Sequence, residues 1–545
     1  MIYTSEPAAP QARATGALTL PVRWREMVRA RGDSAVMQYD GGSLSYTEAD
    51  RRARDLAKGL IAAGVGKGSR IGLLLPNSPD FIVCMIAVAR IGATVLPIST
   101  LSTASELGWL ISSADITHLF AARQFRSQDF GALLCSAFHD LDFGTGPPLY
   151  LSDAPALRQI WFIGDDPGGM NWPLAGLTAL GASIADRLLD RMEDQVDESD
   201  HFVIIHTSGS TSWPKGVIHD HGSLLRHLDN INVIRNLVSE DILFGTSPWF
   251  WIAGFAFSLI GTLAAGACIA CSNATESHKV LDFIERVRPT RTNGFAPIAE
   301  RYAQDPSYVG RDFTSIRGGN LYALLPAALR PHDQGLRHNI YGMTETGGAL
   351  TMSPDESDQP EHRRGSLGKL LPGYEVRIVD PESSKDVQPG RVGELWLRST
   401  LMMVGYLGRQ RHEIFEPDGW WRSGDLCRID RDGFFYIAGR LGDMIKTSGA
   451  NVAPKEVENI IQKLSGCPQC FVIGMPDAER GEVVAAVLVG ACNLTDDELR
   501  DQLTGELSKY KIPRRIFHIR EDDLPAVSSG KPDMAKLKIM VGRMA

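Results

Sequence analysis

The chain contains 545 residues, of which 43% are hydrophobic and 22% are charged. This composition is typical of a soluble globular protein, and the length exceeds what one hydrophobic core supports, so two or more domains are expected. The formal net charge of −9 argues against a nucleic-acid backbone as the main partner. The eight cysteines are too sparse for a disulfide scaffold, and the N-terminus lacks the pattern of a secretory signal, so a reducing cytoplasm is expected.

Helical and strand patterns alternate from about residue 44 onward. Thr47-x-x-Asp50 forms a capping box in its broader form and predicts a helix start, because apolar residues then recur at helical spacing. A short buried strand follows at 70–75, then a helix at 81–91 and a strand at 94–97. Strands separated by helices predict a parallel α/β sheet covered on both faces.

The uncharged stretch 249–271 is long enough to span a bilayer. Pro248 and several glycines interrupt it, and its Lys/Arg flanks are weak. A buried helix at about 253–265 that leads into a strand at Cys268–Cys271 explains the stretch equally well, and we expect no integral membrane span.

The last hundred residues follow a different pattern. Pro454 sits where a helix could begin, and a second capping box, Thr495-x-x-Glu498, predicts another helix. Strands are expected at 470–475, 482–489 and 515–519. This pattern predicts a compact α+β unit that begins near Gly439–Gly442.

The loop 206–217, HTSGSTSWPKGV, crowds hydroxyl side chains, glycines and one lysine directly after an apolar strand. Such groups suit a phosphate, but Lys215 precedes Gly216, so the order differs from the G-x-x-x-x-G-K-[ST] phosphate loop. Residues 341–348 (YGMTETGG) place a carboxylate that would suit Mg²⁺ between glycines, although an exposed turn explains them as well.

Three further stretches contain candidate functional residues. Asp425 follows a glycine and could accept ribose hydroxyls, while Arg440 precedes Gly442 at the predicted domain boundary. Lys531 ends a Gly/Ser loop. The alternatives are a hairpin, a linker and a solvated surface charge, and the hairpin explains Asp432-Gly433 but not Asp425.

Together, in this order, the motifs resemble those of the adenylate-forming superfamily of acyl-CoA synthetases, firefly luciferase-like enzymes and peptide-synthetase adenylation domains. The chain is most similar to the acyl-CoA synthetases, from LSYTEADRRARDLAKGLIAAGVGKGSRIGLLLPNS to the final Gly-Lys pair. The resemblance implies an α/β fold: a large N-terminal domain (1–440) of layered α/β subdomains, and a small mobile α+β lid (441–545) that carries the adenylation lysine.

The resemblance also assigns the nucleotide site. The family loop T-S-G-T-T-G-x-P-K-G closes over the β- and γ-phosphates of ATP, and its matching positions here are Thr207, Ser208, Gly209, Ser210, Thr211, Lys215 and Gly216. Ser212 departs from the family's usual glycine. The other matches are Tyr341 near adenine, Thr344 on phosphate, Glu345 on Mg²⁺, Asp425 and Arg440 on ribose, and Lys531 between the substrate carboxylate and the α-phosphate. Lys531, Thr344, Glu345 and Lys215 would be the catalytic residues.

The family reaction has two halves, with ATP, Mg²⁺ and coenzyme A as cofactors. Carboxylate first attacks the α-phosphate to give acyl-AMP and pyrophosphate. The small domain then rotates about a hinge, here Gly442 in place of the usual charged residue, and Gly449 would line the channel for CoA.

The acid is expected to be hydrophobic: fatty, terpenoid, steroid-like or aromatic. Residues 248–254 resemble the family motif P-x-F-H-x-x-G, with Trp251 replacing histidine, and no aspartate is present there to hold an amino acid. Gly318, Gly319 and Asn320 match the pocket floor, where the asparagine would hydrogen-bond the acyl chain or simply cap the following segment.

The expected partners are therefore a small carboxylic acid and CoA, and no nucleic acid. The alternatives are an acyl-AMP ligase that loads a carrier protein and a nonenzymatic acyl-nucleotide-binding relative. Retention of Lys531, Glu345 and Asp425 argues against a pure binder.

Overall fold

The computed structural model describes residues 2–5, 18–144, 146–164, 173–207, 214–443, 445–447, 450–452, 454–477, 481–507, 511–527 and 531–544. The chain forms two compact units. The larger unit comprises Ser5–Tyr374 and Ser399–Glu416, and the smaller unit comprises Met1–Thr4, Glu375–Arg398 and Pro417–Ala545. The predicted domain boundary at residue 440 falls within the smaller unit. That residues 441–545 move as a separate lid stays a prediction.

A seven-stranded sheet organises the first half of the larger unit. Its strands, in spatial order, are β20 (Gly405–Tyr406), β11 (Lys215–Asp220), β10 (His201–Thr207), β5 (Thr94–Pro97), β4 (Arg70–Leu74), β6 (His118–Ala122) and β9 (Gln159–Ile163). The run from β10 to β9 is parallel, as predicted, whereas β11 and β20 are added antiparallel at one edge.

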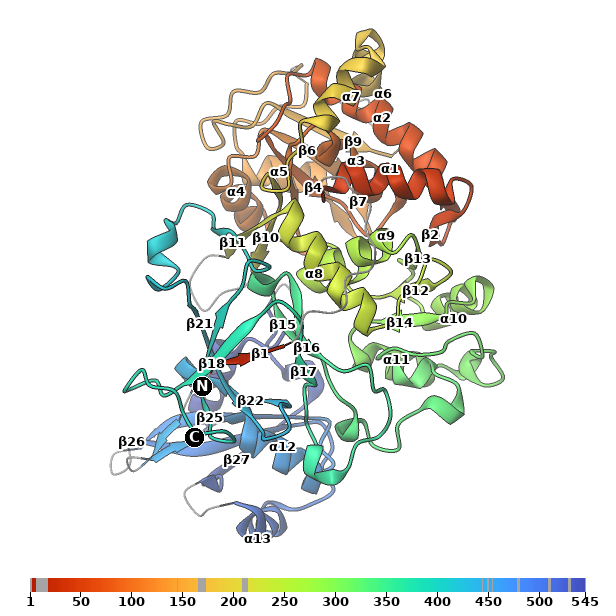
Figure 1. Ribbon diagram of the computed structural model, residues 1–545. Coiled ribbons are helices and arrows are strands. Elements are labelled where there is room, and N and C mark those ends of the chain that lie inside the picture. Colours follow the sequence, from red (N-terminus) through yellow and green to blue (C-terminus); the bar gives the residue numbers. More distant parts are fainter. Residues whose placement is uncertain are drawn as a thin grey trace. The chain divides into compact units, whose positions relative to one another are not determined.

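Helices cover both faces of this sheet. They are α2 (Tyr46–Ala62), α3 (Pro79–Arg90), α4 (Ala104–Ser113), α5 (Phe130–Ala137), α6 (Leu174–Leu180) and α7 (Asp186–Asp194). Figure 1 shows α2 and α3 on one side of the sheet and α4 and α5 on the other. The predicted covering of both faces is therefore confirmed.

The start of α2 corrects one prediction. The cap is Ser45, whose Oγ accepts a hydrogen bond from the Glu48 amide at 3.1 Å, so the helix begins before the predicted Thr47 cap. Asp50 therefore lies inside the helix, where its carboxylate accepts from Trp24 Nε1 at 2.9 Å and from Arg90 Nη2 at 2.5 Å.

A second sheet of five strands lies in the same unit. Its order is β14 (Arg291–Asn293), β12 (Ile242–Gly245), β13 (Cys268–Ala270), β2 (Ala35–Tyr39) and β3 (Gly42–Ser45). The associated helices are α1 (Leu20–Arg31), α8 (His221–Ile234), α10 (Ser277–Val287) and α11 (Ala296–Ala303). Three shorter strands, β15 (Tyr341–Met343), β16 (Gly348–Met352) and β17 (Lys369–Leu370), form a separate sheet, and β7 (Gln124–Phe125) and β8 (Gln128–Asp129) pair with each other.

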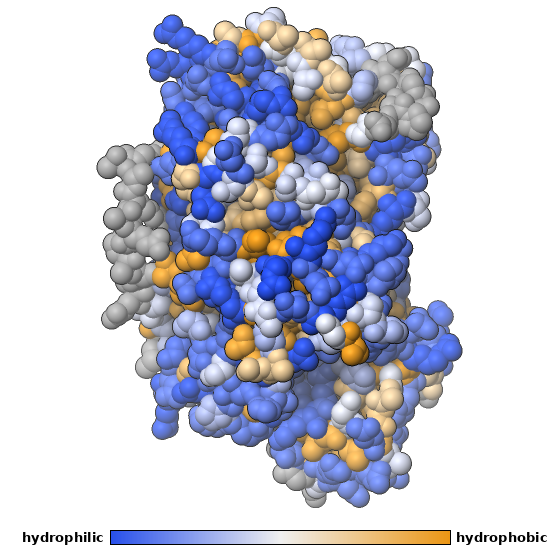
Figure 2. Space-filling view, turned by 90° about the vertical axis from the view of Figure 1, so that its right-hand side faces the viewer, coloured by the Kyte–Doolittle hydropathy of each residue, from blue (hydrophilic) through white to orange (hydrophobic). Residues whose placement is uncertain are grey.

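The apolar stretch 249–271 folds as a buried helix and a strand, as expected. A π-helix, η2 (Ala253–Ile260), continues into α9 (Gly261–Ala264), and β13 follows. Among the described residues, no helix combines the length and the apolar character needed to cross a bilayer. The face shown in Figure 2 is largely hydrophilic, with its apolar residues in small groups.

The smaller unit contains two sheets. The first is antiparallel, in the order β1 (Tyr3–Thr4), β18 (Glu375–Val379), β19 (Gly393–Arg398), β21 (Trp421–Ile429) and β22 (Phe435–Arg440). The second contains β24 (Ala450–Val452), β23 (Ile445–Thr447), β26 (Gly481–Val489), β25 (Gln469–Asp477) and β27 (Arg515–Ile519), with helices α12 (Pro454–Ser465), α13 (Asp496–Glu506) and α14 (Met534–Met544). The predicted α+β pattern is confirmed, including the capping box of Thr495 and Glu498.

Candidate active site

The two ends of the phosphate loop are held together by a β-hairpin. Thr207 ends β10, Lys215 begins β11, and the two residues are direct partners in the antiparallel register. Residues 208–213 lie outside the described residues, so the predicted roles of Ser208, Gly209, Ser210 and Thr211, and the departure at Ser212, stay predictions.

Behind this hairpin, Gly216 has little free space. An added Cβ would lie 3.0 Å from Ile204 and 3.1 Å from Leu407. The close packing of the strands on both sides leaves little room for a side chain at this position.

A tyrosine links Lys215 to the predicted magnesium ligand. Tyr406 donates a hydrogen bond from its hydroxyl to Glu345 Oε1 at 2.8 Å, and Lys215 Nζ lies 5.2 Å from the centre of its ring. The pairing of β20 with β11 places the tyrosine there, because Tyr406 is opposite Val217. The structure therefore brings Lys215 and Glu345, 130 residues apart in sequence, to one aromatic ring.

The turn that carries Thr344 and Glu345 is fixed from several directions. It is a single 3₁₀ turn (Thr344–Thr346, η7), followed by Gly347 at φ 68°, a left-handed conformation that suits glycine. Thr346 Oγ1 bonds to the Met343 amide at 3.2 Å, and the Glu345 carbonyl accepts from the Met403 amide at 2.9 Å.

A buried histidine also contacts the turn that carries Thr344 and Glu345. His219 Nε2 lies 2.8 Å from the Thr344 carbonyl oxygen, and burial lowers the pKa of His219 to about 4. The ring is therefore neutral at pH 7, with Nε2–H donating to the carbonyl. His221, by contrast, begins α8 after the Asp220 cap.

Tyr341 lies three residues before Thr344, half-buried on β15. The glycine after it is required, because a Cβ on Gly342 would lie 2.0 Å from the Gly348 carbonyl oxygen. The tight β15–β16 hairpin thus positions Tyr341, whose proximity to adenine stays a prediction.

The predicted ribose residues meet on the β21–β22 hairpin of the smaller unit. Asp425 and Arg440 are register partners, and Arg440 Nε donates to Asp425 Oδ1 at 2.8 Å. The carboxylate side chain is 8% exposed and the arginine 59% exposed. The hairpin turn is made separately by Asp430–Gly433, so the turn does not account for Asp425.

The other predicted site residues of the smaller unit have few contacts among the described residues. Lys531 is exposed, and its carbonyl accepts from the Val527 amide at 2.9 Å. Gly442 lies in a 3₁₀ turn (Leu441–Asp443, η10), where an added Cβ would meet nothing within 4 Å. Gly449 lies outside the described residues, and its predicted role with CoA stays a prediction.

The predicted pocket-floor residues run beside β14. Gly319 has φ 124°, and a Cβ there would lie 2.1 Å from the Thr292 carbonyl oxygen. Asn320 uses both ends of its amide on one residue: Oδ1 accepts from the Gly294 amide at 3.0 Å and Nδ2 donates to its carbonyl at 2.6 Å. The asparagine therefore fixes the segment at Gly294, 26 residues earlier in the chain, rather than capping the segment that follows it; a contact with the acyl chain stays a prediction. Gly318 accepts a hydrogen bond at its carbonyl from the Thr292 amide at 3.1 Å.

Trp251 is half-buried and packs edge-on to Phe250, with ring centres 5.1 Å apart. Sequence analysis did not single out the polar pair in which Asn293 Nδ2 donates to Ser258 Oγ at 2.7 Å. Phe295 follows Gly294 and is 70% exposed.

Comparisons with known proteins identify the family. Residues 24–407 match the family model of AMP-binding enzymes, and residues 456–531 match that of the AMP-binding enzyme C-terminal domain. A feruloyl-CoA synthase from Amycolatopsis sp is 32% identical over 534 residues, covering 95% of this chain and 98% of the relative. A putative acyl-CoA synthetase, YngI of Bacillus subtilis (strain 168), is 28% identical over 520 residues, covering 93% and 94%.

Solved structures agree with the fold. ATP-bound MatB from Rhodopseudomonas palustris has a TM-score of 0.79 and 25% identity, over 97% of this chain and 100% of that chain. The anthranilate CoA ligase AuaEII, solved with anthranoyl-AMP, has a TM-score of 0.77 and 22% identity, over 97% and 98%. Acyl-CoA synthetases of this family use ATP, Mg²⁺ and CoA, which confirms the predicted cofactors. The chain therefore belongs to the AMP-binding enzymes of the adenylate-forming superfamily, and it is an AMP-forming acid–CoA ligase.

Proposed function

We propose that the enzyme activates a hydrophobic carboxylic acid, with an aromatic acid as the first choice. Residues 248–254 contain no aspartate that could hold the ammonium group of an amino acid. The relatives, which include a feruloyl-CoA synthase and an indoleacetate–CoA ligase, support an aromatic acid. The constellation of Lys215, Tyr406 and Glu345 carries the nucleotide part of the proposal, because it places a cation and a carboxylate beside the phosphate hairpin.

In the first half-reaction, a carboxylate oxygen of the acid attacks the α-phosphorus of ATP, and the bond to the β-phosphate oxygen breaks to release pyrophosphate. Lys215 offsets charge on the leaving pyrophosphate, and Thr344 donates its hydroxyl to phosphate. Glu345 fits Mg²⁺, which takes one or two carboxylates together with substrate phosphate oxygens and would neutralise part of their charge. The acid is already ionised at pH 7, so no general base is needed.

Residues of the smaller unit also have roles in this proposal. Asp425, oriented by Arg440, accepts the ribose hydroxyls, and Lys531 bridges the two anions that react. After rotation about Gly442, the CoA thiol attacks the acyl carbon in a channel that Gly449 lines, and AMP leaves. A cytoplasmic location belongs to the proposal as well, and all eight cysteines are free thiols.

The test uses purified enzyme, Mg·ATP and a panel of aromatic and aliphatic acids, with and without CoA. Pyrophosphate release and thioester mass are followed for the wild type and for Lys531→Ala. Acid-dependent pyrophosphate, with a thioester only when CoA is present, is the expected result. Accumulation of acyl-AMP without thioester would instead favour a carrier protein as acceptor, and no Lys531-dependent pyrophosphate with any acid would contradict the proposal.

A further inference from the structure

A cavity of about 340 Å³ opens at the edge of the seven-stranded sheet where the parallel strands begin. Its lining comes from the starts of β4, β6 and β9, the end of α2 and one loop, and consists of Ala63, Gly64, Ser69, Thr117, His118, Pro148, Tyr150, Arg158 and Gln159. The phosphate hairpin leaves β10 at its carboxyl end, and β10 is parallel to these strands. The cavity therefore lies at the opposite edge of the sheet from Thr207, and its volume is in the range of small-molecule sites.

An arginine without an acidic partner faces this cavity. Arg158 Nη1 donates to the Pro155 carbonyl at 2.6 Å and to the Leu157 carbonyl at 3.1 Å. No ion pair joins it to a carboxylate in the part of the chain that the structure describes. A guanidinium compensated only by carbonyl oxygens retains its attraction for phosphate or carboxylate.

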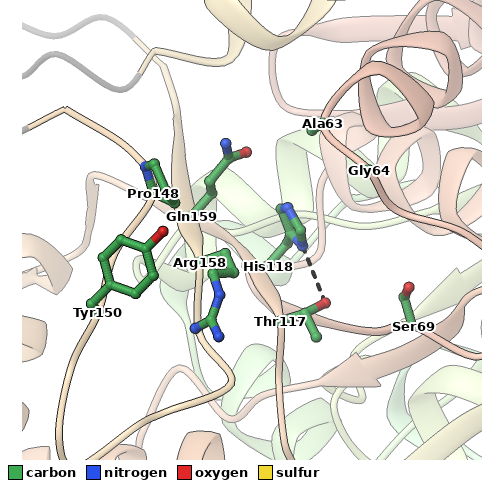
Figure 3. Close-up of a pocket in the computed structure, with 9 residues that line it drawn as sticks. All are labelled: Ala63, Gly64, Ser69, Thr117, His118, Pro148, Tyr150, Arg158 and Gln159. Atoms are coloured by element: carbon green, nitrogen blue, oxygen red, sulfur yellow. Dashed lines mark hydrogen bonds between the residues drawn. The ribbon is translucent and has the colours of Figure 1, made fainter.

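An exposed aromatic ring lies next to the arginine. The Arg158 guanidinium is 5.5 Å from the centre of the Tyr150 ring, which is 79% exposed. Figure 3 shows Tyr150, Arg158, His118 and Gln159 around the cavity. A planar ligand can stack on the uncovered surface of this ring while its anionic group reaches the arginine.

Two polar atoms in the cavity wall have no partner. His118 and Gln159 are opposite one another in the parallel register, so both side chains point to the same face of the sheet. His118 Nε2 and Gln159 Oε1 are shielded from solvent and have no hydrogen-bond partner. Buried polar groups are normally paired, so a small side-chain rotation toward a polar ligand would relieve this cost.

His118 Nε2 and Gln159 Oε1 are both hydrogen-bond acceptors. Thr117 Oγ1 donates to the Arg70 carbonyl at 3.2 Å, so it accepts the Nδ1–H of His118 at 3.1 Å. Burial, followed by the charge of Arg158, lowers the pKa of His118 to about 4, and the neutral ring is left with Nε2 as an acceptor. Both unpartnered atoms are therefore acceptors that require N–H donors from a ligand.

We infer that this cavity is a second nucleotide site that binds an adenine mononucleotide. The phosphate binds Arg158, the base stacks on Tyr150, and the exocyclic amino group supplies N–H donors to Gln159 and His118. The choice of adenine rests on the proposed function, because AMP is a product of that reaction and is released where the enzyme works.

Calorimetric titration of the full chain with AMP tests the site, and two classes of site are expected. Tyr150→Ala weakens one class about tenfold by removing the stacking surface, whereas the matched control Tyr150→Phe leaves it unchanged. Because Tyr150 is exposed, neither change disturbs the fold. Arg158→Ala removes the same class, and Asp425→Ala affects only the other. Inosine monophosphate, which lacks the amino group, binds the Tyr150-dependent class more weakly than AMP.

A single class of site that is insensitive to both Tyr150→Ala and Arg158→Ala would overturn the inference. Inorganic phosphate binding as tightly as AMP would also overturn it, because a simple anion site would then be sufficient. Failure of the proposed function would give a different result. Asp425→Ala would then change no AMP binding, and the class of site that depends on Tyr150 would still be present. Acid-dependent pyrophosphate release by Tyr150→Ala, measured without added AMP, is expected to equal that of the wild type.

Discussion

The turn that carries Glu345 and the segments that carry Lys531 and Gly442 are built in opposite ways. The first is tied by His219, Thr346 and Met403, and its carboxylate is already engaged by Tyr406. Lys531 is exposed, and a Cβ at Gly442 would meet no atom. The difference teaches that the turn proposed to hold phosphate and metal is preorganised, whereas the groups proposed to arrive and withdraw during the cycle have few side-chain contacts among the described residues.

The largest effect is expected from Lys531→Ala. Loss of the cation that bridges two anions should lower acid-dependent pyrophosphate release about 100- to 1,000-fold. Thioester formation from supplied acyl-AMP should change little, because the lysine is withdrawn for that step. Lys536→Ala is the matched control, since Lys536 is an exposed lysine that pairs with Asp533. Equal loss in both half-reactions would show that Lys531 has no special role in adenylation.

Glu345→Gln tests the preorganised side. Removing the charge of the metal-binding carboxylate should lower adenylation about 100-fold and raise the Mg²⁺ concentration needed for half-maximal rate. Glu361→Gln is the control, because this glutamate is an exposed partner of Arg364. An unchanged Mg²⁺ dependence would remove Glu345 from the metal site.

Acid should destabilise the larger unit, because its buried histidines must stay neutral. Burial lowers the pKa of His219 and of His227 to about 4, below the value of about 6.5 in an unfolded chain. In the window between about pH 4 and about pH 6.5, the unfolded state therefore binds more protons than the folded state. The contribution of these histidines to the free energy of unfolding is complete above about pH 6.5 and is lost as the pH falls toward about 4.

His219→Gln keeps a donor for the Thr344 carbonyl but cannot titrate. It should reduce the pH dependence of the free energy of unfolding by up to about 1.4 kcal/mol per pH unit within the window. Urea unfolding at about pH 5 and about pH 7.5 measures this. His518→Gln is the matched control, because it replaces an exposed histidine of the smaller unit and leaves the Thr344 contact intact; a similar reduction in both variants would contradict the assignment.

The smallest effect is expected from Gly442→Ala. The site is sterically open, so the free energy of unfolding should rise by only about 0.4–1 kcal/mol. If residue 442 is the hinge, the ratio of thioester formation to adenylation should shift while each substrate still binds. Gly319→Ala is the contrasting change: its φ of 124° and the 2.1 Å approach to Thr292 predict a clear loss of stability. A ratio unchanged in Gly442→Ala would place the hinge elsewhere.

Local signals predicted most of the elements, because helix caps and apolar periodicity act over a few residues. The strand 94–97, the helix start at Pro454 and the Thr495 capping box were all found this way. The α2 cap was misplaced by two residues because Ser45-x-x-Glu48, which has the standard capping spacing, lies just before Thr47-x-x-Asp50 and is the pair that caps the helix.

Charged site residues were predicted from the sequence, and their roles stay predictions, whereas the side chains that hold them in place were missed. Tyr406 is on a two-residue strand with no periodicity, and it meets Glu345 only because that strand pairs with β11. His219 was missed because nothing in the sequence connects it to a carbonyl 125 residues away. Contacts between segments that are remote in the chain were therefore the part that the sequence left open.

The position of β20 has a consequence for truncated forms of the enzyme. The chain leaves the larger unit at Tyr374 and returns to it at Ser399, and only this returning segment supplies the strand that covers β11. A fragment ending at residue 374 would expose a β11 edge containing Val217 and Ile218, a template for intermolecular pairing. Fragments made for expression should therefore end after residue 416, where the larger unit is complete.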